Sequence, residues 1–511
     1  MTLKDSPSQL VGLKLVLATM ALGLGSFMNV LDISIANVSL PSIAGDFAVS
    51  PAQGTWIITS YAVSEAIMLP LTGWLAGRFG DVRQFTVATL LFTLASLLCG
   101  ASQSFEMLLI SRVLQGVVGA SMIPLSQSLI IKIFPANKRG AALGIWSLTL
   151  IIAPVLGPVV GGWLTDNYVW RFVFFINIPF GLLCAFAVTK LMKGRESPKV
   201  ITPIDKVGLA LLTIGIGSLQ ILLDKGNELN WFGSTTICIL AIVSAITLIS
   251  LVIWELGEEY PVVNLRLFAN RNFLIAASCL GLGSYAFYIF VIIGPLWMQT
   301  QLGYTPTLAG EVMAAVGCLS IFFGPFFGIN LDRFGARQVA TIGFTAFGIA
   351  AWMSGSITSD VSFAHLQLVR LLAGIGIAGF FVPMTAISLS QIKPQQISAA
   401  TGLTNFLRNM GGSVGTAIGV TIWQNQASTY HANLVEYVNP ANPGYNQFLS
   451  SLSARGMSDI QISQYFDVLV NAQAYVLSTN HLLILSGMIM VSLVPVIWFA
   501  KPPFGGGGGG H

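Results

Sequence analysis

The segment GWLAGRFG at residues 73–80 returns in altered form as GINLDRFG at residues 328–335. A second segment, RVLQG at 112–116, returns as RLLAG at 370–374. A third match consists of three glycines with the same spacing: Gly144, Gly157 and Gly161 return as Gly402, Gly415 and Gly419. Because the three matches keep their order and nearly the same separation, the chain contains two related halves.

The composition places these halves in a membrane. Of the 511 residues 54% are hydrophobic and 9% are charged, against about 25% charged in an average soluble domain. Apolar stretches of about 20 residues recur, and each can cross a hydrocarbon core of about 30 Å as a helix. The alternating pattern of a β-barrel is absent. The sequence therefore predicts an all-α polytopic membrane protein.

Fourteen transmembrane helices are expected, and corresponding helices of the two halves lie eight positions apart. Two extra helices must then separate two six-helix halves, as in carriers built from parallel repeats. The predicted divisions are 1–200 for the first half, 201–260 for the extra pair and 261–511 for the second half. The predicted spans are 14–38, 53–75, 84–104, 106–131, 140–164, 170–191, 206–224, 234–256, 272–298, 308–330, 338–358, 362–385, 397–422 and 479–500.

The distribution of lysine and arginine predicts the orientation. With the N-terminus inside, only Arg171, Lys225 and Arg455 among the loop cations fall outside. This asymmetry is the one expected of a membrane protein with both termini in the cytoplasm. A long external connection, about 425–478, carries the turn signal NPANPG at 439–444 between polar segments that can form amphipathic helices.

Several other classes of protein are disfavoured. The apolar run after the short polar N-terminal stretch contains Asp32 and no cleavage site, so we expect helix 1 to be retained rather than removed as a signal peptide. The five cysteines are scattered without CxxC or histidine pairing, which indicates neither a disulfide framework nor a metal site. There is no phosphate-binding loop and no catalytic cluster. We therefore expect no enzyme and no cofactor.

The repeated segment carries the first family resemblance. Gly73, Arg78, Gly80, Asp81 and Arg83 resemble the signature loop between helices 2 and 3 of the major facilitator superfamily. Gly77 departs from the pattern, because an acidic residue is usual there. In the second half Asp332 and Arg333 supply the acid and the base. The resemblance implies that these residues control the conformational change.

Two further motifs narrow the resemblance. LDISIANVSLP at 31–41 is similar to the helix 1 motif of the fourteen-helix drug:proton antiporters, and Gly144 with APVLGPVVGG at 153–162 is similar to their antiporter motif. With NFLRN at 405–409, the likeness extends over the chain and resembles the EmrB-type multidrug exporters most. It implies export of hydrophobic toxic compounds in exchange for protons from a bacterial inner membrane, together with a periplasmic membrane-fusion adaptor and an outer-membrane channel, and no nucleic acid.

Asp32 is the first candidate for proton coupling. An ionised, unpaired carboxylate deep in an apolar helix costs at least ~2.5–3.5 kcal/mol on insertion scales. Desolvation favours the protonated carboxyl and a nearby cation favours the ionised one, so a site whose wetting or pairing changes can load and release protons. The alternative is a permanent ion pair that only holds helix 1 in place. Glu65 in helix 2 is a second candidate, for which packing is an equal alternative.

Arginines are expected to modulate these carboxyls. Arg112 lies in helix 4 beside Gly116 and Gly119, and the resemblance links it to proton transfer; the alternative is an arginine buried to satisfy carbonyls or Asp32. Arg370 is its expected counterpart in the second half. Arg408 is expected to face inward. The candidate lining of a substrate cavity consists of aromatic, flexible and polar residues, which are also compatible with ordinary core positions: Phe27, Met28, Asn29, Trp146, Tyr288, Trp297, Met298 and Arg408.

The helix 5 motif predicts a narrow, bent helix surface. Its small and ring residues are Pro154, Gly157, Pro158, Gly161 and Gly162. Such a surface packs closely against another helix, so the hypothesis is a hinge or a seal against proton leak, and the alternative is plain helix packing.

These features predict rocking-switch antiport, in which protonation of Asp32 from outside lowers the affinity for drug and favours return to the inward-facing state. Two alternatives stay open at this point. One is a nutrient or metabolite permease on the same fold, since fold alone does not decide direction or substrate. The other is a membrane receptor or assembly subunit whose external connection binds a partner without transport.

Overall fold

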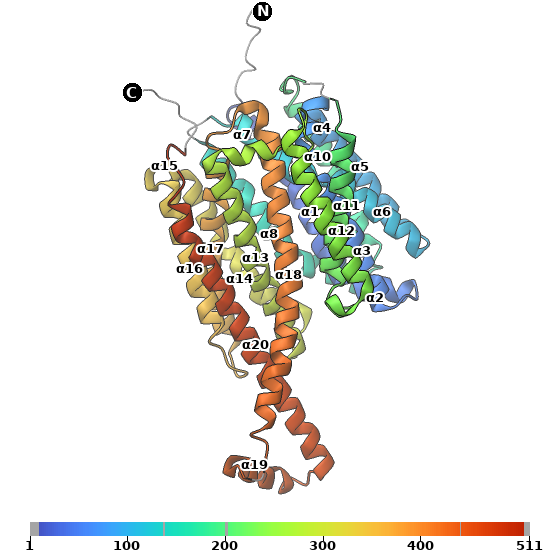
Figure 1. The fold of residues 1–511 in the computed structure, drawn as a ribbon, viewed down its shortest axis with the longest axis vertical. Helices are drawn as coiled ribbons and strands as arrows, with labels where there is room; N and C mark the ends of the chain where they lie inside the picture. The colour runs from blue at the N-terminus through green and yellow to red at the C-terminus, as the bar shows by residue number, and fades with distance from the viewer. Residues whose placement is uncertain (1–9, 136–137, 200–202, 440, 505–511) are drawn as a thin grey trace, which may run out of the picture.

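The protein is a long bundle of helices in a computed structural model, which describes residues 10–135, 138–199, 203–439 and 441–504 (Figure 1). Within these ranges the regular structure is entirely helical. Eleven helices of the described part are long and apolar enough to cross a membrane. The prediction of an all-α polytopic membrane protein is therefore confirmed.

The first half contains all six predicted helical segments, three of them divided. Pro70 separates α3 from α4, because proline lacks the N–H that continues a helix. The segments 106–131 and 170–191 are also divided, into α6 with α7 and α9 with α10, without a proline at the break. The helices are α1 (Leu13–Asp46), α2 (Pro51–Gly54), α3 (Trp56–Met68), α4 (Thr72–Phe79), α5 (Asp81–Gly100), α6 (Phe105–Gly119), α7 (Met122–Ile133), α8 (Arg139–Asn167), α9 (Phe172–Phe175) and α10 (Asn177–Leu191).

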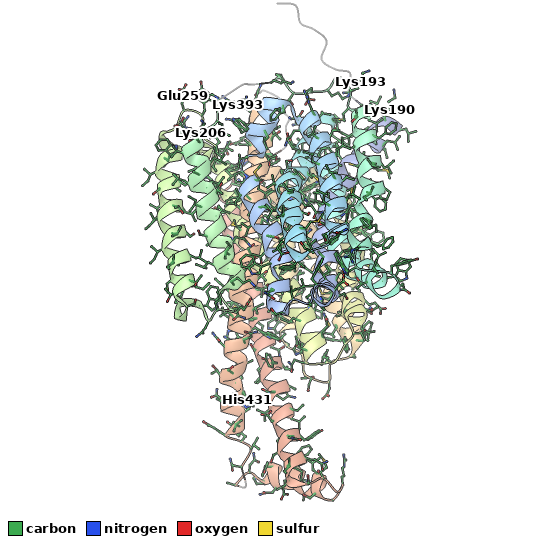
Figure 2. All side chains as sticks on the ribbon, turned by 90° about the vertical axis from the view of Figure 1, so that its right-hand side faces the viewer. Lys190, Lys193, Lys206, Glu259, Lys393 and His431 are labelled. Carbon is green, nitrogen blue, oxygen red and sulfur yellow. The ribbon has the colours of Figure 1, made fainter. Side chains whose placement is uncertain are left out.

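Two helices follow at one side of the bundle, α11 (Lys206–Lys225) and α12 (Thr235–Gly257). They are the pale green pair at the left of Figure 2. α11 packs against α3, α12 and α18, whereas α12 leaves Ile242, Ile246 and Ile249 exposed. An apolar helix face without a protein partner in a membrane protein faces lipid. A short turn of helix, η2 (Trp231–Gly233), precedes α12, and η3 (Leu265–Ala269) leads into the second half.

The second half repeats the architecture and adds a projection. Its helices are α13 (Arg271–Thr300), α14 (Pro306–Ile329), α15 (Leu331–Phe334), α16 (Ala336–Ser354), α17 (Phe363–Leu389), η4 (Pro394–Gln396), α18 (Ile397–Val435), α19 (Pro443–Ser453) and α20 (Asp459–Ile497). The ends of the bundle are called here the α4 end, at the top of Figure 1, and the hairpin end, at the bottom. The described chain starts and finishes at the α4 end.

The predicted long connection at 425–478 is mostly helix. α18 and α20 continue past the rest of the bundle and carry α19 at their tip (Figure 1). A capping box of Ser458 and Gln461 starts α20, and Tyr445 and Phe448 of α19 contact the ring of Phe466. The polar segments beside the turn thus extend the membrane helices themselves. We call residues 424–476 of α18, α19 and α20 the helical hairpin.

Three predicted spans are helical but are not among the eleven apolar helices: 53–75, 338–358 and 397–422. The first is interrupted at Pro70. α16 carries Arg337 and α18 carries Arg408 among other polar side chains, which lowers their hydropathy. Helix formation is therefore as predicted on these segments, and their passage through the membrane stays a prediction.

Close helix crossings depend on glycine. A Cβ on Gly379 of α17 would lie 2.6 Å from Cα of Gly343 in α16, closer than real Cβ atoms approach. Gly140 and Gly144 of α8 meet Gly328 and Gly324 of α14 backbone to backbone. Small residues of this kind let helices pack within a membrane, where the hydrophobic effect adds little between helices.

Replacing Gly379 by alanine should lower the unfolding temperature of the detergent-purified protein by several degrees, because overpacking a tight contact costs about 1–3 kcal/mol. The matched control is Gly317→Ala in α14, where a Cβ meets nothing within 4 Å. Equal unfolding temperatures for the two variants would contradict the role of this crossing.

Candidate functional site

Asp32 and Arg112 form an ion pair in the centre of the first half. Nη1 of Arg112 in α6 lies 2.6 Å from Oδ2 of Asp32 in α1, and both side chains are fully buried. Oδ1 of Asp32 accepts hydrogen bonds from Gln115 Nε2 at 2.9 Å and Asn177 Nδ2 at 2.7 Å. Ser96 Oγ accepts from both amides and holds them in place. The carboxylate is therefore bound by one cation and two amides.

Arg112 makes further contacts with α3. Its Nε donates to the carbonyl of Ile57 at 3.1 Å, and its guanidinium lies 4.4 Å from the centroid of the Tyr61 ring. Nη2 is buried and finds no hydrogen-bond partner in the described part of the chain. Removing one charge of a buried pair leaves the other uncompensated, which is strongly unfavourable. A proton on Asp32 must therefore be accompanied by a change in the surroundings of Arg112.

Tyr61 connects this pair to the second predicted carboxyl. Its hydroxyl accepts from Asn29 Nδ2 at 2.9 Å and donates to Glu65 Oε1 at 3.4 Å. Glu65 is 6% exposed, and its Oε2 accepts from Asn409 Nδ2 of α18 at 3.3 Å. Glu65 thus lies where the two halves meet. The chain of contacts runs from the buried ion pair to the opposite half.

Some predicted cavity residues surround Glu65 and others do not. Asn29 contacts Tyr61, which donates to Glu65, and Arg408 of the second half lies near enough to attract the Glu65 carboxylate. Tyr288 lies near the same two groups. Glu65 forms no ion pair within 4.0 Å in the described residues.

The remaining predicted cavity residues are dispersed. Met28 and Trp146 lie in the core of the first half, where Trp146 Nε1 donates to Ser126 Oγ at 2.8 Å, and Phe27 packs partly buried on a neighbouring cluster. Trp297 and Met298 line a small cavity in the second half. The structure does not bring these five residues together around one hollow.

A larger hollow of about 200 Å³ lies at the α4 end. None of the residues that line it was predicted from the sequence to line a cavity. They come from the end of α3, from α4, from the connection after α12 and from α18, and include Pro70, Trp74, Tyr260, Asn264, Ala399 and Leu403.

The signature loop of the first half forms a charged cluster. Asp81 is buried and pairs with Lys132 at the end of α7, and Ser197 Oγ donates to its Oδ2 at 2.7 Å. Glu196 accepts from the backbone N–H groups of Val82 and Arg83, at 2.8 and 3.1 Å, at the start of α5. A carboxylate is favourable at a helix N-terminus. Asp81 of the loop and Glu196, which follows α10, thus supply carboxylates beside the signature loop, whose usual acidic position is occupied by Gly77.

The other signature residues have different surroundings. A Cβ on Gly73 would overlap Ala399 of α18, so Gly73 lies at the contact between the halves. Gly80 has φ +91°, which disfavours other residues, and Arg78 lies 5.4 Å from the Trp74 ring. Arg83 is exposed. In the second half Asp332 and Arg333 of α15 are both exposed, and the described part contains no ion pair of Asp332.

The helix 5 motif lies on α8 and faces α1. A Cβ on Gly157 would overlap Ser34, and one on Gly161 would lie 3.2 Å from Cα of Ile35. Ser34 Oγ donates to the carbonyl of Pro154 at 3.2 Å. Gly162 faces open space, and the side chain of Pro158 is outside the described part. The motif therefore contacts α1 at Ser34 and Ile35, two and three residues after Asp32.

The opposite face of α8 touches the second half. Gly140 and Gly144 meet the backbone of α14, so the motif helix lies between the helix of Asp32 and the other half. A shift of α1 can be transmitted through this helix without a flexible side chain in between. This is the geometry that a coupling helix requires, and it is equally the geometry of close packing.

Several polar partners were missed by sequence reasoning. Gln115 belongs to the repeated RVLQG segment, so its recurrence as Ala373 was an available signal that the two halves differ here. Asn409 ends the NFLRN segment at 405–409, but its own side chain was not singled out, and Asn177 and Ser96 lie in no motif that we recognised. Their roles depend on helices that are distant in sequence.

The comparisons with known proteins agree with this architecture. The model of the Major Facilitator Superfamily matches residues 22–285 and 273–425. The chain is 44% identical to the multidrug export protein EmrB of Haemophilus influenzae, covering 96% of each chain, and 42% identical to EmrB of Escherichia coli K12, covering 98% of each. It is 40% identical to the fatty acid resistance protein FarB of Neisseria gonorrhoeae, over 98% of this chain and 99% of that one.

A solved structure supports the fold independently. The human organic anion transporter MFSD10 superposes with a TM-score of 0.60 at 14% identity, covering 95% of this chain and 100% of that one. The chain is therefore a membrane transport protein that belongs to the major facilitator superfamily, and its similarity to the EmrB proteins extends over nearly its whole length.

Proposed function

We propose that this protein exports hydrophobic toxic compounds in exchange for protons across a bacterial inner membrane. In this proposal the chain crosses the membrane fourteen times and the α4 end, with both termini, is cytoplasmic. One observation carries the coupling: the buried Asp32–Arg112 pair is connected through Tyr61 to Glu65 at the contact between the halves. The EmrB relatives, whose names state multidrug export, support the direction and the substrate class.

Protonation of Asp32 begins the return step in this mechanism. The neutral carboxyl no longer balances Arg112, so the guanidinium shifts toward the Ile57 carbonyl or the Tyr61 ring, its other neighbours. Movement of Tyr61 changes the hydrogen bond to Glu65 and thereby the contact with Asn409. A proton bound differently by two conformations shifts their populations. Each proton entering at 100 mV contributes about 2.3 kcal/mol.

Contacts at the α4 end form the gate that must open toward the cytoplasm. Ser128 of α7 and Ser398 of α18 are hydrogen-bonded at 3.0 Å, and Asn405 donates to Gln127 at 2.9 Å. Gly73 abuts Ala399 in the same region. In this proposal these contacts hold the cytoplasmic side closed. Rocking one half against the other breaks them and exposes the site to drug inside.

Asp32→Asn should abolish drug-dependent proton movement in sealed vesicles with an imposed pH gradient, because asparagine retains the amide contacts but cannot exchange a proton. The matched control is Asp46→Asn. Asp46 is the last residue of α1, is exposed and pairs with Arg171. We expect the control to retain wild-type exchange at equal expression. Drug-coupled proton flux in Asp32→Asn equal to wild type would place coupling elsewhere.

Cysteines at 128 and 398 should lock the gate. The two serine oxygens are 3.0 Å apart, so S128C and S398C side chains are near enough to form a disulfide after small adjustments. In a background without the five native cysteines, oxidation should stop transport and reduction should restore it. Each single variant serves as the control. If transport continues in the fully cross-linked protein, these contacts do not need to open.

The helical hairpin is the surface we propose for the periplasmic adaptor. It projects beyond the bundle on the side opposite the α4 end, and it exposes apolar residues such as Tyr437, Ile460 and Val468 (Figure 1). Tyr445, Phe448 and Phe466 give the tip its own small aromatic core. Through an adaptor and an outer-membrane channel, exported compounds would leave the cell rather than collect in the periplasm.

Shortening the hairpin should separate transport from resistance. His431 Nδ1 lies 2.9 Å from Asn471 Oδ1, so residues 432–470 can be replaced by a short Gly-Ser loop across this contact (Figure 2). We expect drug-coupled proton movement in vesicles to persist, while cells that contain the adaptor and channel lose resistance. Full resistance in those cells would contradict the adaptor proposal, and loss of flux in vesicles would show that the hairpin belongs to the transport unit.

A further inference from the structure

Arg370, which repeats Arg112 in the second half, pairs with no carboxylate among the described residues. Arg370 of α17 is 3% exposed, and its Nη1 donates to the carbonyl of Phe290 at 3.3 Å. Its guanidinium lies 4.0 Å from the centroid of the Phe290 ring. None of the ion pairs in the described residues includes Arg370. A buried guanidinium with an aromatic ring but no anion is a poorly compensated charge.

A small cavity adjoins this guanidinium. Its lining includes Arg370 and Gly294, Trp297, Met298, Val369 and Leu483. The centre of a water-sized sphere can move within about 10 Å³ of this cavity. That space holds about one water molecule or one monatomic ion. A Cβ on Gly294 would overlap Nη2 of Arg370, so glycine makes room for the guanidinium at this edge.

A second donor of the lining is also unpaired. Trp297 is 1% exposed, and its Nε1–H is buried without a hydrogen-bond partner in the described structure. Buried indole N–H groups normally find an acceptor. The side chains around the cavity thus provide a positive charge and an N–H donor, and Ser354 supplies the one hydroxyl among otherwise apolar neighbours.

We propose that this cavity is a binding site for a small monovalent anion of the halide class. The guanidinium supplies the charge, the indole N–H supplies a directed hydrogen bond, and the apolar walls exclude bulk water. A cation is repelled by Arg370. A water molecule could accept from Trp297 but would leave the charge of Arg370 unbalanced, so an anion fits the donor set better.

The proposed anion takes the place of the missing carboxylate. In the first half Asp32 is a covalently attached counter-ion of Arg112, and it can be neutralised by a proton. In the second half the counter-ion of Arg370 would be exchangeable with the solution. It would hold α13 to α17, the helices of Trp297 and Arg370. This inference concerns the stability of the second half and does not depend on the direction or substrate of transport.

Thermal unfolding of the detergent-purified full chain tests the site without a transport assay. At equal ionic strength, replacing sodium gluconate by sodium chloride or bromide should raise the unfolding temperature by at least about 2 °C and should saturate with halide concentration. Trp297→Phe, which removes the N–H and keeps a ring, should reduce this halide-dependent rise at least twofold. Arg370→Met should abolish it.

The matched control is Trp352→Phe in α16, since Trp352 is 63% exposed and does not line the cavity. It should show the wild-type response to halide. Equal unfolding temperatures of wild type in all the salts would overturn the proposal and leave water as the occupant. A full halide response in both Trp297→Phe and Arg370→Met would also overturn it, because the anion would then bind elsewhere. If Arg370→Met fails to fold, Trp297→Phe alone decides between these results.

Discussion

The rest of the first half is arranged around one buried ion pair. Asp32 and Arg112 lie where water cannot solvate them, so each of their polar atoms needs a protein partner or remains unsatisfied. Those partners come from distant parts of the chain, through Gln115, Asn177 and the Ile57 carbonyl. The pair therefore fixes the relative positions of α1, α3, α6 and α10.

The two halves share a fold but differ in their charges. The first half has a carboxylate beside its buried arginine and a charged cluster at its signature loop. In the second half Arg370 has an aromatic neighbour, and Asp332 is exposed. The two halves nevertheless share their close helix packing. Glycines of α8 lie against α1 in the first half, and the matching glycines of α18 lie against α13 in the second half. The buried carboxylate–arginine pair is thereby confined to the first half of the described chain, and the other half supplies Asn409 and Arg408 near Glu65 at the interface.

Much of the fold could be predicted from the sequence because lipid imposes a simple requirement. Every membrane segment must satisfy its own backbone hydrogen bonds, so apolar length alone predicts helices, and helices occupy all the predicted segments. The helical hairpin was predicted only in part. Its polar segments were expected to be able to form amphipathic helices beside the turn, whereas in the structure they continue α18 and α20 beyond the bundle, with Ser458 and the aromatic contacts of Phe466 stabilising this extension. Such stabilisation depends on contacts between α19 and α20 that local composition does not reveal.

Asp32 and Arg112 could be picked out as candidate site residues from the amino-acid order alone, because a charge inside an apolar run is costly and differs from its neighbours. The internal repeat could be found in the same way, through its matching glycines. The folded arrangement was needed to show that Gln115 and Asn177 complete the site and that Tyr61 connects it to Glu65. It was also needed to show that Phe27, Met28, Trp146, Trp297 and Met298, predicted to line one cavity, lie in different parts of the bundle. Uncharged polar and aromatic side chains are common in membrane helices, so their role depends on which face meets which neighbour, and that is set by packing across the whole bundle.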